Sequence, residues 1–259
     1  MTSVIKLENV TKRFSGLVAV NDLSIEMPKN CIHSLIGPNG SGKTTTVNMI
    51  TGTIPVTEGK IYYNDKQISG KPIYQIARLG IGRTFQNLKL FGSMSLLENL
   101  MIGAHQKTNI GLLRFLMDLK GSKREEVMLR ECSEAILEQI GLQDLRNEKV
   151  KNLSYGKQKM IELGRALIMK PDLLILDEPA AGLNPSERKE FIDILLKTHD
   201  RGIDLFLIEH NMDVVMNIST KITVINFGAK IAEGTASDIQ NNKEVIKAYL
   251  GDKYKPLQQ

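Results

Sequence analysis

Short apolar runs alternate with longer amphipathic stretches along this chain, and the alternation is typical of a mixed α/β fold. Residues 4–10, 18–20 and 23–27 have the short pattern of strands joined by turns. Residues 31–36 are mostly apolar, and residues 173–176 are entirely so. Continuous apolar runs of this length are typical of parallel strands buried on both faces. The sequence therefore predicts an antiparallel β subdomain near the N-terminus and a mixed or parallel sheet with helices as the core.

The pattern changes to helical spacing between residues 95 and 145. Residues 96–101 and 126–140 place apolar side chains at helical spacing, with charged side chains on the opposite face. A helical insertion of this size within an α/β chain predicts a separate lobe. We expect one domain over residues 1–259, with an α/β core of residues 1–91 and 156–232, a helical lobe of residues 92–155, and a C-terminal helix and tail of residues 233–259.

The remaining pattern predicts two hairpins and one more strand. Residues 58–65 form a hairpin with its tight turn near Asn64 and Asp65, and residues 222–231 form a closing hairpin. Residues 203–209 are a further apolar strand, which delivers His210 at its end.

Composition and charge narrow the class of protein. The 259 residues include 34 Lys and Arg against 29 Asp and Glu, for a net charge of +5, and this mild excess is spread along the chain. It does not favour a nucleic-acid partner, although a slightly basic surface suits an anionic membrane face. Neither Cys31 nor Cys132 has a C-x-x-C neighbour, so we expect two reduced thiols. No apolar stretch is long enough to span a bilayer, and any work at a membrane would be that of a peripheral subunit.

A phosphate-binding loop is the strongest chemical signal. Residues 37–44 read GPNGSGKT, which has the spacing G-x-x-x-x-G-K-[ST] and lies between a predicted strand and a predicted helix. The glycines let backbone amides turn inward, and the helix N-terminus adds the positive end of its dipole. We expect Lys43 to reach the β- and γ-phosphates, Thr44 to ligate magnesium and Thr45 to contact the α-phosphate. The candidate nucleotide-binding residues of this loop are Gly37, Asn39, Gly40, Ser41, Gly42, Lys43, Thr44 and Thr45.

Two carboxylates follow the apolar run of residues 173–176. Asp177 and Glu178 lie at the C-terminal end of a predicted parallel strand, where α/β sheets bind their ligands. We expect Asp177 to hold magnesium through its water shell and Glu178 to polarise the attacking water. His210 is a candidate for a hydrogen bond to the γ-phosphate.

For three further residues, the local sequence alone does not decide between a structural and a functional role. The ring of Phe14 lies in a polar turn, where it either stacks on adenine or packs in the core. Ser154 is a natural N-cap for the helix predicted over residues 159–169, and helix N-termini attract anions. Gln86 ends the strand-like run of residues 81–86, where a lone glutamine is usually a surface residue.

Together these motifs resemble the ATP-binding subunit of an ABC transporter over nearly the whole chain. The matching segments are residues 37–44 for Walker A, Gln86 for the Q-loop, residues 153–158 for the signature, residues 173–178 for Walker B, residues 182–185 for the D-loop and His210 for the switch histidine. The resemblance implies a P-loop NTPase core that uses ATP and Mg²⁺. It also implies catalytic roles for Glu178, His210 and Gln86, and metal ligands among Thr44, Gln86 and Asp177.

The same resemblance implies partners. Two ATPase subunits would pair head to tail, so that Ser154 and Gly156 contact the γ-phosphate held by the other subunit, which is a second copy or a related paralogue. Integral membrane permease subunits would bind this pair at the cytoplasmic face of the membrane, a substrate-binding protein would act indirectly, and no nucleic acid is expected. The chain departs from the usual motifs at Tyr155, Lys157 and Asn184, but Lys43, Glu178 and His210 are present, so we expect active hydrolysis.

Within that family, residues 83–86, 94–100 and 245–251 resemble the subunits that power bacterial import of branched-chain amino acids. The ATPases of urea or amide importers and of lipid exporters are alternatives. A soluble ABC ATPase of translation or DNA repair is a more distant alternative, because such proteins commonly carry tandem cassettes or long coiled-coil insertions. In a P-loop kinase or switch protein, the signature, Gln86 and His210 would have no role.

Overall fold

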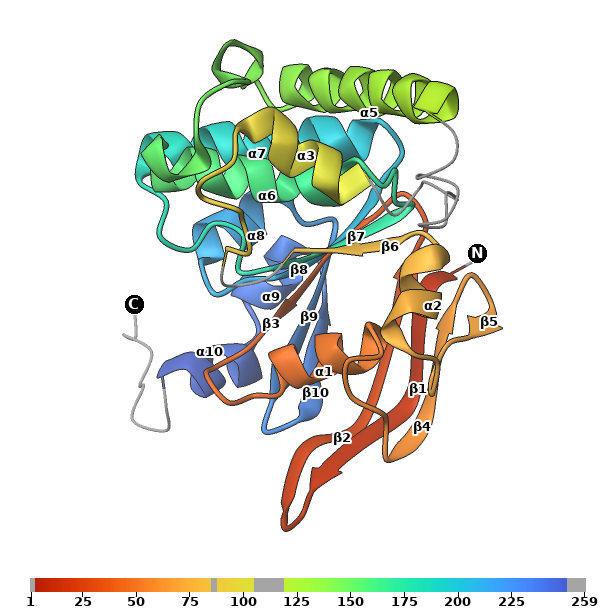
Figure 1. The fold of residues 1–259 in the computed structure, drawn as a ribbon. Helices are drawn as coiled ribbons and strands as arrows, with labels where there is room; N and C mark the ends of the chain where they lie inside the picture. Colours follow the sequence, from red (N-terminus) through yellow and green to blue (C-terminus); the bar gives the residue numbers. More distant parts are fainter. Residues whose placement is uncertain (1–2, 85–87, 105–118, 251–259) are drawn as a thin grey trace. The chain divides into compact units, whose positions relative to one another are not determined.

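The chain divides into two compact units, which we call the sheet unit and the helical unit. The computed structural model describes residues 3–84, 88–104 and 119–250 (Figure 1). The sheet unit comprises Met1–Arg83, Asp172–Ala181 and Thr198–Gln259, and the helical unit comprises Thr84–Pro171 and Gly182–Lys197. These bounds differ from those expected for a lobe of residues 92–155, and the predicted domain division stays a prediction.

An antiparallel sheet of four strands forms from the N-terminal part of the chain, in the order β2-β1-β4-β5. The strands are β1 (Ser3–Phe14), β2 (Leu17–Pro28), β4 (Glu58–Tyr63) and β5 (Lys66–Gln67). The predicted hairpin between β4 and β5 is confirmed: Asn64 and Asp65 have φ angles of 46° and 61°. These left-handed conformations are those that a tight two-residue hairpin turn requires.

A second sheet of six strands has the order β10-β9-β3-β8-β7-β6. The strands are β3 (Ile32–Ile36), β6 (Ile81–Arg83), β7 (Leu173–Asp177), β8 (Asp204–Ile208), β9 (Lys221–Asn226) and β10 (Ala229–Gly234). All neighbours pair in parallel except β9 and β10, which form the predicted closing hairpin. Every residue of β3, β7 and β8 is buried, as the continuous apolar runs predicted for strands of a parallel sheet.

One core of buried apolar residues joins the two sheets to the first helix. The helices of the sheet unit are α1 (Lys43–Ile50), α2 (Ile73–Arg78), α8 (Met212–Ile218), α9 (Ala236–Gln240) and α10 (Lys243–Leu250). Strands β3, β8 and β7 pair in parallel, so their C-terminal ends lie at the same edge of the sheet. The segments that follow these strands therefore begin at that edge.

The helical unit is built around the mutual packing of α3, α5 and α6. Its helices are α3 (Leu96–Ala104), α5 (Leu119–Gln139), η2 (Gln143–Leu145), η3 (Val150–Asn152), α6 (Tyr155–Leu167) and the greater part of α7 (Pro185–Asp200). Gly164 allows close packing, since a Cβ there would lie 3.1 Å from side-chain atoms of Leu100, Ile136 and Ile140. The predicted helices over residues 96–101 and 126–140 are confirmed.

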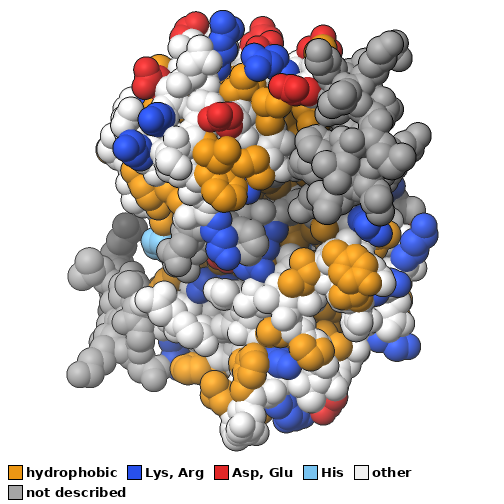
Figure 2. Space-filling view, viewed as in Figure 1, with side chains coloured by type: hydrophobic (Ala, Val, Ile, Leu, Met, Phe, Trp, Pro, Cys, Tyr) orange, Lys and Arg blue, Asp and Glu red, His pale blue; other side chains and the backbone are white. Residues whose placement is uncertain are grey.

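The face drawn in Figure 2 carries hydrophobic side chains in separate patches, with charged side chains between them. Among the helices that the structure describes, none combines the length and apolar composition needed to cross a bilayer.

Candidate functional site

Residues 37–42 form a tight loop between β3 and α1. Ser41 N–H donates to Pro38 O at 3.2 Å, and Gly228 N–H donates to Ser41 O at 3.0 Å, which ties the turn after β9 to the loop. Only glycine fits at two positions, because a Cβ at Gly37 would lie 2.0 Å from Ile225 O and a Cβ at Gly42 would lie 2.5 Å from Ala19 O. Gly37 and Gly42, two of the glycines predicted for phosphate binding, are thus also required by the packing of the loop, whereas a Cβ at Gly40 would meet no atom within 4 Å.

The ammonium group of Lys43 is folded onto the loop. Its Nζ donates to Gly37 O at 2.8 Å and to Pro38 O at 2.9 Å, and it lies 3.5 Å from Ser41 Oγ. Burial lowers the pKa of Lys43, while the nearby carboxylates of Glu178 and Asp177 oppose that shift. Lys43 is therefore held on the loop carbonyls, within electrostatic reach of Glu178 and Asp177.

The start of α1 is an anion-binding arrangement. Gly42 occupies the N-cap with no side-chain cap, and the first turn contains no acidic residue. The amides of Lys43, Thr44 and Thr45 lie in that turn, where N–H groups have no acceptor within the helix. Thr44 is exposed and Thr45 half-buried at the helix start, whereas Asn39 and Gly40 form the exposed tip of the loop. The residues present fit a bound phosphate chain.

Asp177 is buried at the end of β7 and is paired with Arg83. The Arg83 Nη2 to Asp177 Oδ2 distance is 3.1 Å, and Arg83 Nη1 donates to Asn48 Oδ1 at 2.8 Å and to Thr51 Oγ1 at 3.1 Å. Arg83 therefore joins β6, the C-terminal end of α1 and the acidic end of β7. The sequence analysis did not predict this role for Arg83. The available signal was its position as a basic residue at the end of a predicted strand, since another predicted strand ends in carboxylates.

Glu178 lies at a sharp turn directly after β7. Its φ angle is 49°, and its N–H donates to Ile208 O at 2.8 Å. A carboxylate oxygen of Glu178, Oε1, lies 3.8 Å from Nδ1 of His210, whose side chain is 55% exposed. The structure thus places His210 beside Glu178, and Glu178 and Asp177 act electrostatically on Lys43, while the roles assigned to these residues stay predictions.

Phe14 ends β1, opposite Leu17 of β2. Its side chain is 45% exposed, and Lys12 Nζ lies 4.9 Å from the ring centroid. The alternative that Phe14 is an ordinary core residue is therefore wrong. Stacking on adenine stays a prediction.

In the helical unit, Ser154 is the N-cap of α6, as predicted. Its hydroxyl accepts from Lys157 N–H and donates to Glu187 Oε1 at 3.1 Å. A Cβ at Gly156 would lie 2.5 Å from Glu187 Cδ, so this carboxyl group covers both predicted signature residues. The sequence did not predict the contact, because it joins residues 33 positions apart.

Two departures from the usual motifs have local structural explanations. The ring of Tyr155 packs against Gly182, since a Cβ at Gly182 would lie 2.9 Å from Tyr155 Cε1. Asn184 Oδ1 accepts Glu187 N–H at 3.0 Å, and Glu187 Oε2 accepts Asn184 N–H at 3.3 Å. Asparagine and aspartate are equally good helix caps, so Asn184 preserves the start of α7.

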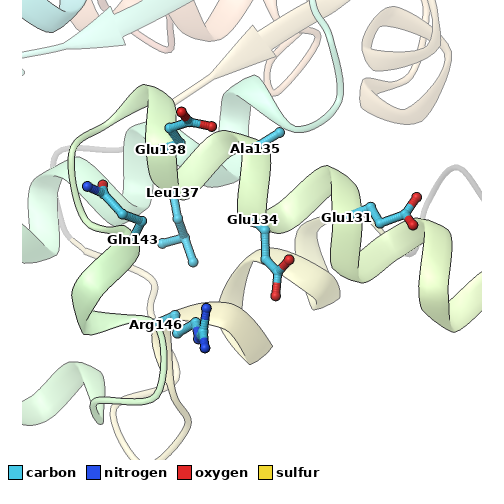
Figure 3. A pocket seen from close by; sticks show the side chains of 7 residues that line it. All are labelled: Glu131, Glu134, Ala135, Leu137, Glu138, Gln143 and Arg146. Carbon is cyan, nitrogen blue, oxygen red and sulfur yellow. The ribbon is translucent and has the colours of Figure 1, made fainter.

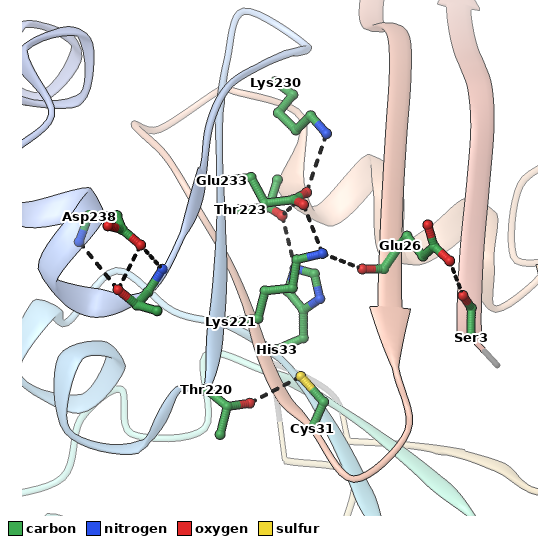
Figure 4. A network of polar contacts seen from close by, with 11 residues as sticks. Ser3, Glu26, Cys31, His33, Thr220, Lys221, Thr223, Lys230, Glu233 and Asp238 are labelled. Carbon is green, nitrogen blue, oxygen red and sulfur yellow. Dashed lines mark hydrogen bonds and ion pairs between the residues drawn. The ribbon is translucent and has the colours of Figure 1, made fainter. Parts of the chain in front are cut away.

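A polar network runs from the buried side chains of His33 and Thr223 to the more exposed Glu233, Lys221 and Lys230 beside β3, β9 and β10 (Figure 4). His33 Nε2 lies 2.9 Å from Thr223 Oγ1, whose hydroxyl donates to Glu233 Oε2 at 3.2 Å. Glu233 also pairs with Lys221 at 2.8 Å and with Lys230 at 3.3 Å. Because the single proton of Thr223 goes to Glu233, the Nε2 of His33 must be the donor to Thr223.

A pocket of about 470 Å³ in the helical unit is not a second phosphate site. Figure 3 shows Glu131, Glu134 and Glu138 projecting from α5, with Arg146 on the facing segment. Phosphates placed there would meet several carboxylates, and like charges repel. Gln86, the remaining predicted site residue, lies outside the described residues.

Comparison with known proteins identifies the family. A protein-family profile described as ABC transporter matches residues 20–181, and one described as branched-chain amino acid ATP-binding cassette transporter matches residues 229–255. The chain is 42% identical over 251 residues to the high-affinity branched-chain amino acid transport ATP-binding protein LivG of Salmonella typhimurium, covering 96% of this chain and 98% of LivG. The chain belongs to the ABC transporter family of ATP-binding cassettes.

A second relative and two solved structures agree with this family assignment. It is 40% identical over 250 residues to BraF of Pseudomonas aeruginosa, a protein with the same description as LivG, covering 96% of this chain and 98% of BraF. Its fold matches the ADP conformation of an ATP-binding cassette of an ABC transporter with a TM-score of 0.85 and 34% identity, over 97% of this chain and 100% of that one. A nucleotide-free cassette from an ABC transporter matches with a TM-score of 0.85 and 33% identity, over 96% and 100% of the two chains.

The predicted family and fold class are therefore confirmed, and this cassette is an ATPase of the ABC class. The small-molecule kinase alternative is wrong. The roles of the individual site residues stay predictions.

Proposed function

We propose that this chain binds and hydrolyses ATP as the cassette of an importer for branched-chain amino acids. The observation that carries the proposal is the juxtaposition of the phosphate loop with Asp177, Glu178 and His210 in a chain 42% identical to LivG. LivG and BraF are described as branched-chain amino acid transport proteins, which favours import of these amino acids over urea import, lipid export or a soluble role.

ATP binding is assigned to the phosphate loop and the residues around it. The first-turn amides of α1 and the loop residues Gly37–Thr45 would accept the phosphates, with Lys43 moving from the loop carbonyls to phosphate oxygens. A lysine with three rotatable donors can exchange carbonyl partners for charged ones, because charge-assisted hydrogen bonds are stronger than those to carbonyls. The half-exposed ring of Phe14 would stack on the adenine.

The same site has ligands suited to Mg²⁺. The hydroxyl of Thr44 and the carboxylate of Asp177 are the hard oxygen donors that this ion prefers, and Gln86 is the third predicted ligand. A bound ion would supply positive charge to the phosphate oxygens. Arg83 holds Asp177 in one orientation for this contact.

Hydrolysis is assigned to Glu178 and His210. Glu178 would orient a water for in-line attack on the γ-phosphate, because phosphoryl transfer depends more on a positioned nucleophile than on a strong base. His210 would donate a hydrogen bond to the γ-phosphate from its exposed ring. The developing charge would be stabilised by Lys43 and the amides of α1.

The signature residues would act on a second subunit. Ser154 and Gly156 would contact the γ-phosphate bound by the other ATPase subunit, so that ATP joins the two. Closure and reopening of this pair would be passed to integral membrane permease subunits at the cytoplasmic face of the membrane. A substrate-binding protein would deliver the cargo to those subunits.

The variant Glu178→Gln tests this assignment. We expect ATP to bind normally and kcat to fall at least about a hundredfold, because the amide cannot orient and polarise the water as a carboxylate does. ATP should then trap a closed dimer that is visible by size-exclusion chromatography. In cells lacking this chain, the wild type should restore uptake of leucine and Glu178→Gln should not. Near-normal turnover by the variant would contradict the role of Glu178.

A further inference from the structure

A fully buried carboxylate lies directly beside the candidate catalytic residues. Glu209 follows β8 and is 0% exposed. Its Oε1 accepts Ala180 N–H at 2.9 Å, and its Oε2 accepts His210 N–H at 2.9 Å and Asn211 N–H at 3.1 Å. Burying a carboxylate is costly unless hydrogen bonds replace its water, and these backbone donors meet that need. All the donors belong to the segments that carry Glu178 and His210.

The side chain of Glu209 extends the hydrogen bonding between β7 and β8 beyond the point where backbone pairing ends. The pairing of β7 with β8 ends at Asp177 and Ile208, and Glu178 N–H adds one more bond, to Ile208 O at 2.8 Å. The next residue is Pro179, which has no N–H to donate. The Glu209 carboxylate instead reaches Ala180 N–H, so the turn after β7 stays attached to the segment after β8.

We propose that Glu209 is a positioning residue for ATP hydrolysis. Its two oxygens fix the backbone on both sides of the site, and they thereby set how Glu178 and His210 face each other. The inference rests on the proposed function, because it takes Glu178 as the water-orienting group and His210 as the γ-phosphate contact.

The conformation of Glu178 explains why such a clamp is needed. Its φ angle of 49° is unfavourable for a residue with a side chain and persists only where the surroundings hold it. The N–H groups of Glu178 and Ala180 are the two anchors, one to Ile208 O and one to Glu209. Losing the second anchor would let the turn relax.

The other carboxylate oxygen of Glu209 holds the backbone of His210 in place. The imidazole itself is 55% exposed, so its position depends on the backbone that carries it. Glu209 Oε2 holds the N–H groups of His210 and Asn211, and Asn211 in turn caps α8 through Val214 N–H. A displacement of about 1 Å at a catalytic group can cost about a hundredfold in rate.

The variant Glu209→Gln tests the clamp. The amide oxygen can still accept from His210 and Asn211, but the NH₂ group then faces the N–H of Ala180, and two donors cannot bond to each other. We expect kcat to fall at least about tenfold and the KM for ATP to stay within about twofold, because the phosphate loop is not touched. Glu209→Asp keeps the charge but is shorter by one CH₂, so it should lose kcat as well.

Asp204→Asn is the matched control. Asp204 begins the same strand, is buried, and accepts Cys31 N–H at 2.8 Å at the end of β8 away from the site. Because it lies at the far end of β8, Asp204→Asn should keep kcat and KM near those of the wild type, whatever its effect on thermal stability. A purely structural role for Glu209 would make the two variants behave alike.

The outcomes separate this inference from the proposed function. Suppose that Glu178→Gln has a low kcat, but Glu209→Gln either keeps kcat within twofold of the wild type or loses activity only through a higher KM. The positioning role of Glu209 is then wrong, and the proposed function stands. If Glu178→Gln hydrolyses ATP normally, the role of Glu178 fails and this inference fails with it. If the wild type neither hydrolyses ATP nor restores uptake of leucine, the proposed function itself fails. Should Glu209→Gln not fold, Glu209→Asp carries the same expectation, and wild-type kcat in that variant would overturn the inference.

Discussion

His33 shows how one residue can link the stability of the sheet unit to pH. Burial lowers the pKa of His33 from 6.5 to about 3, with a further lowering from Lys221, an opposing effect of Glu233 and a smaller lowering from Lys230. Nε2 donates to Thr223, and Nδ1 has no hydrogen-bond partner among the described residues. A proton on Nδ1 would therefore enter a buried place with no acceptor.

We predict that His33→Phe makes the free energy of unfolding depend less on pH between pH 7 and pH 5. In the unfolded chain His33 gains a proton as the pH falls below 6.5, whereas in the folded chain it stays neutral down to about pH 3. The unfolded state thus binds more protons in this window, and the wild type should lose about 2 kcal/mol through His33 between pH 7 and pH 5.

Urea unfolding at the two pH values measures the effect. Phenylalanine is close to histidine in size and would lie beside Phe206, whose ring centroid is 5.4 Å from that of His33. The fall in unfolding free energy from pH 7 to pH 5 should be smaller in the variant by about 2 kcal/mol. An equal fall in both proteins would show that His33 does not carry the acid sensitivity.

At the scale of elements, the start of α6 is held by a carboxylate from α7. Ser154 donates to Glu187 at 3.1 Å, and the same carboxyl group lies over Gly156. If these residues contact a γ-phosphate on another subunit, Glu187 occupies the place that the phosphate needs. An anion at a helix N-terminus is favourable, so carboxylate and phosphate would compete for the same groups.

We predict that Glu187→Gln favours the ATP-bound dimer. A hydrogen bond to a neutral amide is weaker by about 1 kcal/mol than one to a carboxylate, which corresponds to about a fivefold lower ATP concentration for half-maximal dimerisation. Light scattering in the Glu178→Gln background measures this. In a double-mutant cycle, the effect should vanish when Ser154→Ala is also present. A higher ATP requirement in Glu187→Gln would contradict the competition.

The same elements show which features a sequence can predict. The phosphate loop, the Ser154 cap and the acidic end of β7 depend on residues a few positions apart, so local pattern was sufficient. The contacts of Arg83 with Asp177, of Glu187 with Ser154 and of Glu209 with Ala180 join residues 94, 33 and 29 positions apart. Their partners follow from the strand order, which the sequence alone does not provide. The exposure of Phe14 likewise required the pairing of β1 with β2.

At the scale of the whole molecule, each unit carries one part of the proposed ATP site. The sheet unit contains the phosphate loop, Asp177, Glu178 and His210, and the helical unit contains Ser154 and Gly156. Head-to-tail pairing would complete each site with residues of two subunits. The partner ATPase is then a second copy or a paralogue that supplies an equivalent helical unit.

We predict that this chain copurifies with polytopic membrane proteins and an ATPase. Tagged at one end in its native cell and isolated in mild detergent, it should recover permease subunits, because the proposed importer cannot move its cargo without them. A tagged Glu209→Gln chain is a suitable control, since a defect in hydrolysis should leave this assembly intact. Recovery of a different cassette would identify a heterodimer, and recovery of this chain alone with the permeases a homodimer. Recovery of ribosomes or DNA-repair factors without membrane proteins would contradict the importer while leaving the ATPase chemistry in place.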